Sequence, residues 1–193
     1  MPKKLNLTGD ADADKLLSDD PFALLTGMLL DQQISMEIAF AGPKKIADRM
    51  GGFSVAKIAE SDLDGFVELC VQKPAIHRYG GSMGRRVHAL AQYIVENYDG
   101  RTDAIWTEAD PDGKEVLKRL KALPGFGDQK ARIFLALLGK QRGVEPTGWR
   151  EAAGAYGDAD ARRSIADVVD DQSLAEVRAW KKEQKAAAKA AKD

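Results

Sequence analysis

The chain has 193 residues and a net charge of −1, with 44% hydrophobic and 31% charged residues, as in ordinary soluble globular proteins. That length suits one packed core, so we expect a single domain over residues 1–193 and no second full domain. The uncharged run Phe22–Leu30 is far shorter than the ~20 residues of a membrane span, and no signal peptide is evident. The chain has a single cysteine, Cys70, which excludes an internal disulfide.

The first third of the chain has apolar residues at helical spacing. This spacing predicts a helix over Pro21–Phe40, with Asp20 as its N-cap and Pro21 at its first position. We expect Gly42-Pro43 to break the pattern, so that a second helix covers Lys44–Met50 and ends at the glycines that follow.

The remainder of the chain also has helical patterns and none of the alternation of a sheet, which predicts an all-α fold. Helices are expected over about Val55–Glu60, Asp62–Val71, Ser82–Tyr98, Gly113–Ala122 and Asp128–Gly139, with a loop over Lys73–Gly81. The Ala- and Lys-rich segment 174–193 is expected to be an exposed basic helix or a frayed tail, either a solvated surface or an extra phosphate contact.

Charge is unevenly distributed although the total is close to zero. Thr8–Glu37 holds seven acidic residues and one basic residue, whereas Lys114–Arg142 holds eight basic residues and two acidic ones. A nearly neutral protein can present one basic face, and phosphate binding requires no more than that.

The segment Leu123-Pro124-Gly125-Phe126-Gly127 joins two predicted helices through a very short link. Its two glycines allow positive φ and close approach to another chain. Backbone N–H groups beside a helix N-terminus then form an anion site suited to a DNA phosphate. We expect Phe126 to point into the core, and Lys121, Lys130 and Arg132 to add positive charge.

This segment resembles the helix-hairpin-helix (HhH) motif, L-P-G-apolar-G, which would cover about residues 114–139. Upstream, Leu29-Leu30-Asp31-Gln32-Gln33-Ile34-Ser35 resembles the Q-Q motif of HhH glycosylases. Long amide side chains such as Gln32 and Gln33 can fill the gap left by a flipped nucleotide or bond to base edges.

Together the two motifs make the chain similar, from Pro21 to Trp149, to the HhH-GPD superfamily of base-excision repair glycosylases, in a small branch without an iron–sulfur cluster. The resemblance implies an all-α, HhH DNA glycosylase-like helical fold of two closely packed lobes. It also implies binding to double-stranded DNA containing a damaged base. We expect a monomer in the cytoplasm, associated with the nucleoid. The DNA contacts that follow from it are Gln32, Gln33, Gly125, Phe126, Gly127, Gln129, Lys130 and Arg132.

Two family features are missing from this sequence. Lyase-active members have a lysine where this chain has Gln129. Lys130 follows directly, but one residue along a helix turns its side chain by about 100° from that position. We therefore expect Lys130 to be a phosphate contact or a surface lysine rather than a Schiff-base nucleophile. The family's catalytic aspartate has no counterpart in 143–149. A carboxylate would stabilise an oxocarbenium-like transition state, and Glu145 and Asp31 are the candidates, beside the alternative that no carboxylate serves.

Trp149 either stacks on an extruded base or packs in the core. His77 and His88 lie eleven residues apart without other ligands at metal-binding spacing, so we expect surface or capping roles and no metal site. The resemblance adds a monovalent cation at the hairpin carbonyls as the one cofactor to consider.

Three hypotheses remain open at this point. The first is a monofunctional DNA glycosylase, which hydrolyses the N-glycosidic bond of a flipped damaged base. The second is a non-catalytic DNA-binding or lesion-sensing module, motivated by the missing aspartate and lysine. The third is a helical protein-interaction domain without a role on DNA.

Overall fold

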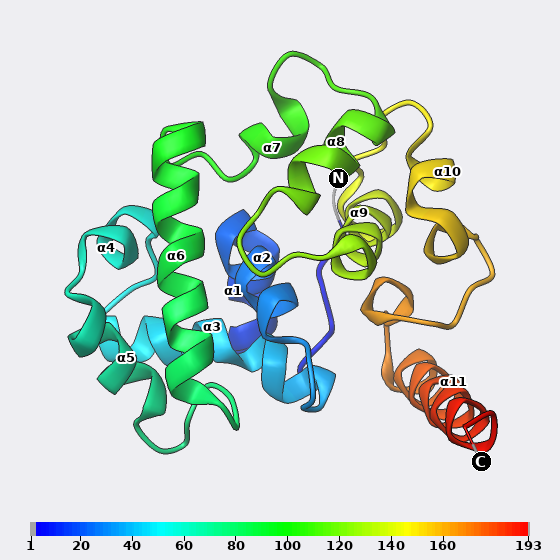
Figure 1. Ribbon diagram of the computed structural model, residues 1–193, viewed down its shortest axis with the longest axis horizontal. Helices are drawn as coiled ribbons and strands as arrows, with labels where there is room; N and C mark the ends of the chain where they lie inside the picture. Colours follow the sequence, from blue (N-terminus) through cyan, green and yellow to red (C-terminus); the bar gives the residue numbers. More distant parts are fainter. Residues whose placement is uncertain (1–2, 193) are drawn as a thin grey trace.

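The computed structural model describes residues 3–192, whose regular elements are all helices or 3-10 turns, with no strand among them (Figure 1). The predicted all-α class is therefore confirmed. The elements are α1 (Ala11–Asp19), α2 (Pro21–Leu30), α3 (Met36–Met50), α4 (Val55–Glu60), α5 (Leu63–Val71), α6 (Gly80–Tyr98), α7 (Ala104–Thr107), α8 (Gly113–Lys121), α9 (Asp128–Arg142), α10 (Trp149–Ala153), the 3-10 turns η1 (Gly154–Gly157) and η2 (Ile165–Asp167), and α11 (Asp171–Ala190).

The helices surround one continuous set of buried side chains. Helix α6 carries α4 and α5 on its outer side, and α8 and α10 pack on α9 at the opposite side of the molecule (Figure 1). Helix α2 lies between them and contacts both α6 and α9. Its side chains are buried all round, as expected for a short helix with no polar residue besides Thr26. The end of α2 is thus held at the centre of the molecule.

The helix predicted over Pro21–Phe40 is wrong in its boundaries, because the chain leaves the helix at Asp31 and re-enters it after Ser35. Helix α3 instead runs through Gly42 and Pro43, where a break was expected. A Cβ at Gly42 would lie 2.5 Å from Leu30 Cδ1, so this glycine lets α3 approach α2 closely. Its role is in packing between helices, and the interruption that matters is the loop at residues 31–35.

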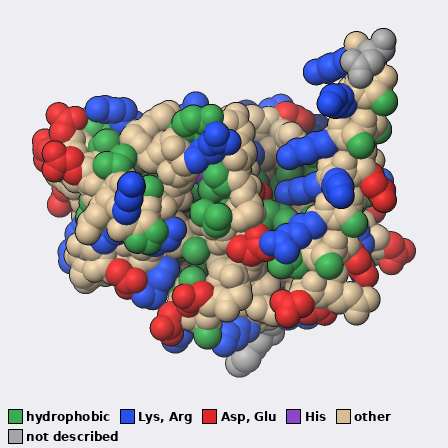
Figure 2. Space-filling model, turned by 90° about the horizontal axis from the view of Figure 1, so that it is seen from below, with side chains coloured by type: hydrophobic (Ala, Val, Ile, Leu, Met, Phe, Trp, Pro, Cys, Tyr) green, Lys and Arg blue, Asp and Glu red, His purple; other side chains and the backbone are tan. Residues whose placement is uncertain are grey.

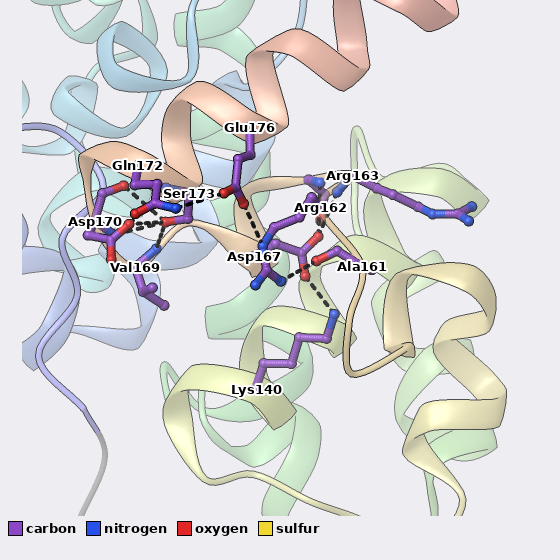
Figure 3. Close-up of polar contacts among 11 residues, drawn as sticks. Lys140, Ala161, Arg162, Arg163, Asp167, Val169, Asp170, Gln172, Ser173 and Glu176 are labelled. Carbon is purple, nitrogen blue, oxygen red and sulfur yellow. Dashed lines mark hydrogen bonds and ion pairs between the residues drawn. The ribbon is translucent and has the colours of Figure 1, made fainter.

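The base of α11 is fixed by polar contacts (Figure 3). Asp170 and Ser173 form a capping box at its start. Lys140 on α9 donates from Nζ to Asp167 Oδ1 over 2.6 Å, in an ion pair almost removed from solvent. Asp167 also accepts from the backbone N–H of Arg163, and Arg162 pairs with Glu176 at 2.8 Å. The basic C-terminal segment is therefore an anchored helix and not a frayed tail.

Three smaller features concern Cys70, the two histidines and the length of the apolar helices. Cys70 is free and buried, and burial raises the pKa of its thiol to about 12. A surface position for His77 and His88 is wrong: both are buried, and each Nε2 lies 2.9 Å from a backbone carbonyl oxygen, of Gln32 and Ser61 respectively. Within residues 3–192, no helix is long and apolar enough to cross a membrane.

Candidate nucleic-acid interface

A cavity of about 1050 Å³ opens where the loop 31–35, the start of α9 and the inner side of α11 meet. One carboxylate and five cations line it: Asp31, Arg78, Lys130, Arg163, Lys181 and Lys185. The other lining residues are neutral: Met28, Gln32, Gln33, Ile34, Ser35, Gln129, Ile133, Tyr156, Trp180 and Gln184. Such a strongly positive hollow with apolar and aromatic surface suits an anionic ligand that carries a planar ring.

Asp31 ends α2 and is partly buried in the wall of this cavity. Burial raises the pKa of its carboxyl above the ordinary value, and the positive charges of Lys181 and Lys130 oppose this effect. A carboxylate deprived of water but facing cations can stabilise a developing positive charge or orient a water molecule.

Lys130 lines the same cavity and is partly buried, so of its two expected roles the plain surface lysine is wrong. Its Nζ donates to the backbone carbonyl of Leu29 at 2.5 Å and to Gln32 Oε1 at 2.8 Å. Burial is the main reason that its pKa is lowered to about 8, while Asp31 acts in the opposite sense. An ammonium has three N–H donors, so two hold the loop and the third remains for a ligand.

The turn at Gln32 is held from a second side by His77. The imidazole Nδ1 accepts the backbone N–H of Tyr79 at 3.0 Å, so the proton is on Nε2, which donates to the Gln32 carbonyl at 2.9 Å. Gln33 follows in a left-handed conformation, with φ of 58°, and is exposed. The fixed Gln32 thus presents Gln33 toward solvent at the mouth of the cavity.

The predicted hairpin borders the cavity through α9. Phe126 points into the core and meets Phe134 edge to face at 6.3 Å, as expected. Gly125 has φ of +80°, and a Cβ there would lie 2.4 Å from Leu29 Cδ1. Gly127 caps α9 without any side-chain hydrogen bond to the first turn, so the N–H groups of that turn are open to an external acceptor.

The hairpin residues Gly125, Phe126 and Gly127 do not line the cavity, and three further predicted site residues also lie outside it. Arg132 donates to the carbonyl of Ala152 at 2.6 Å and pairs with Asp128, so its guanidinium serves contacts within the protein. Glu145 is exposed in the loop between α9 and α10. Trp149 is only 7% exposed and packs so tightly that a Cβ at Gly139 would lie 2.6 Å from its ring, which is the core-packing alternative.

Sequence reasoning missed several residues of the cavity: Arg78, Tyr156, Arg163, Trp180, Lys181 and Lys185. Tyr156 accepts a hydrogen bond from Gln129 Nε2 at 3.0 Å, and the Arg163 guanidinium lies 5.6 Å from the centre of the Trp180 ring. The basic composition of 174–193 was the only signal for this wall, and it did not show which side chains face the loop 31–35.

A comparison with protein families decides what this arrangement belongs to. Residues 26–192 match the model described as HhH-GPD superfamily base excision DNA repair protein. The chain belongs to the HhH-GPD superfamily. Neither the curated proteins nor the solved structures gave a match. The suspected family is confirmed, and the match runs past Trp149 to include α11. As an HhH-GPD member the chain is a base-excision DNA repair protein, of a group that binds DNA.

The pKa of Lys130 leads to a prediction that does not depend on catalysis. Because the folded-state pKa is about 8 against 10.5 for a free lysine, the unfolded chain binds more protons between these values. The free energy of unfolding should therefore rise with pH in that window, by roughly 1–2 kcal/mol between pH 7.5 and 9.5. Urea unfolding of wild type and Lys130→Gln at both pH values isolates this contribution. The free energy of unfolding of wild type, relative to that of the variant, should be larger at pH 9.5 than at pH 7.5. A difference that is independent of pH would contradict the lowered pKa.

Proposed function

We propose that this protein is a monofunctional DNA glycosylase in which Asp31 supplies the carboxylate that other members carry on the missing aspartate. The observation that supports this most strongly is the position of Asp31. It is the single acidic residue among those lining the cavity, and it lies beside Gln32, Gln33 and Lys130. Glu145, the other candidate, does not line the cavity.

The proposed reaction is hydrolysis of the bond between C1′ of the deoxyribose and a ring nitrogen of the base. The bonding electrons leave with the base, and the Asp31 carboxylate stabilises the positive charge that develops at the sugar. Water then adds to C1′ and transfers a proton to Asp31, which leaves an abasic site. Asp31 returns this proton through solvent to the departed base anion, which regenerates the carboxylate. The third N–H of Lys130 faces the leaving base, where a positive charge stabilises the departing electrons.

The cavity is proposed to receive the flipped nucleotide, while the hairpin N–H groups and the start of α9 bind a phosphate of the same duplex. Gln33, which is exposed at the cavity mouth, is proposed to occupy the gap in the base stack. The partner is then double-stranded DNA that carries a damaged base, bound by one copy of the protein.

A single-turnover assay tests this function on duplexes containing uracil, 8-oxoguanine, hypoxanthine, alkylated purines or oxidised pyrimidines. Strand cleavage only after alkali identifies a monofunctional glycosylase and its substrate. Cleavage without alkali, together with covalent trapping by borohydride, would identify a lyase, and Lys130 is the amine in the cavity that would form the Schiff base. Release of no base from any duplex would refute the proposal.

The alternative is a non-catalytic lesion-binding module, which the missing family aspartate favours. It predicts tight binding to abasic or mismatched duplex without turnover. A loss of turnover on changing Asp31 would exclude it, because a module without catalysis has no turnover to lose.

A further inference from the structure

Helix α11 continues well beyond the body of the protein. Its first half is held by the buried side chain of Val177 and by an ion pair between Arg178 and Glu37 of α3. From residue 182 onward every described residue is exposed. In Figure 2 this part projects from the molecule, with Lys and Arg side chains along the side that faces the rest of the protein.

The lysines of α11 form a stripe that begins in the cavity. Lys181 and Lys185 line the cavity, and Lys189 follows at the same spacing of four residues. At about 100° per residue these three lie within a sector of about 80°, and they span roughly 12 Å of helix. Among residues 3–192 none of the three forms an ion pair with a carboxylate, and the one acidic side chain from 177 to 192 is Glu183.

The composition of this stripe indicates its partner. Outside the lysines the projecting part is largely alanine, so it lacks the large apolar face with which amphipathic helices enter membranes. Nucleic-acid backbones bind through rows of cations, and 12 Å corresponds to roughly three to four nucleotides along one strand. The row also starts at the cavity where the nucleotide would be extruded.

We propose that α11 is a phosphate-binding arm that holds the strand carrying the flipped nucleotide, next to the cavity. This inference rests on the proposed function, because it requires DNA at the cavity. The anchored base of the helix keeps the stripe aligned with the cavity: the Lys140–Asp167 ion pair and the capping box fix the start of α11, and Arg178 fixes its middle.

The salt dependence of duplex binding tests the arm. Lys185→Gln together with Lys189→Gln removes two charges and retains a good helix former at both positions. Each lost phosphate contact should lower the slope of log K against log salt by about 1, so the double variant should lower it by about 2. The control is Lys57→Gln with Lys73→Gln, which removes the same charge from exposed positions on α4 and the loop after α5.

Each outcome is informative. A reduced slope in the α11 variant and an unchanged slope in the control support the arm, provided that circular dichroism shows equal helix content. Equal slopes in wild type and the α11 variant overturn it, while base release by wild type would leave the glycosylase proposal intact. If wild type binds no duplex at about 50 mM salt, where phosphate contacts are strong, both proposals fail.

Discussion

Replacement of Asp31 by asparagine is expected to lower the rate of base release by at least about a hundredfold, the usual effect of removing one group that stabilises transition-state charge. Asparagine has nearly the same shape, but it cannot carry the negative charge that the sugar requires. The measurement is single-turnover base release on the best substrate of wild type, at saturating enzyme.

The fold should survive this change, which separates a catalytic loss from unfolding. Burial raises the pKa of Asp31, so the ionised form penalises the folded protein above the ordinary carboxyl pKa, and stability is lost as pH rises. Asparagine removes that penalty, so the melting temperature at neutral pH should be equal or higher. Duplex binding should be equal or tighter, since a negative charge beside the DNA is gone.

Glu145→Gln is the matched control for Asp31→Asn. It makes the same chemical change at an exposed loop position outside the cavity, and base release should stay at the wild-type rate. If Glu145→Gln abolished turnover and Asp31→Asn did not, the catalytic carboxylate would have to reach the nucleotide from the loop after α9.

The second large effect is expected at Gly125. Alanine there adds a Cβ 2.4 Å from Leu29 Cδ1. It must also adopt a φ of +80°, a backbone conformation that residues other than glycine rarely adopt. Strain and overpacking together should cost about 2–4 kcal/mol of stability. Because Leu29 belongs to the end of α2 that Lys130 holds, the loop 31–35 should shift, and duplex affinity should fall at temperatures where the protein remains folded. Urea unfolding and a binding titration measure the two effects.

Gly127→Ala provides the comparison within the same hairpin. Gly127 has φ of −89°, and no atom lies within 4 Å of an added Cβ, so its stability should change by only about 0.5 kcal/mol or less. Equal destabilisation by the two substitutions would mean that the contact between Gly125 and Leu29 does not support the hairpin.

Much of the fold could be predicted because helical spacing and capping residues are local signals. Helix α4 was predicted at Val55–Glu60 without error, and α8 and α9 were predicted within a few residues, since each has a clear apolar side or a flanking glycine. The failure at α3 has a tertiary cause. Gly42 and Pro43 resemble a helix end, but the absence of a side chain at Gly42 is used to pack against Leu30.

The site was predicted only where a short motif contains it. The hairpin and the glutamines were found from consecutive residues. The contacts of Lys130 could not be predicted in this way, because they are made to Leu29 and Gln32, which lie about one hundred residues away in sequence. His77 and Trp180 belong to no recognised motif. Only the folded chain brings His77 to the Gln32 carbonyl and Trp180 to the cavity.

The loop 31–35 has a consequence for synthesis of the protein on the ribosome. The loop is supported by His77, by Lys130 and, through Glu37 of the adjoining helix, by Arg178. These three residues leave the ribosome at separate times, and Arg178 is synthesised 141 residues after Glu37. A nascent chain that has folded α2 and α3 still lacks the amine and the helix that complete the cavity. Partly synthesised chains therefore lack the complete cavity until α11, which forms one of its walls, has emerged.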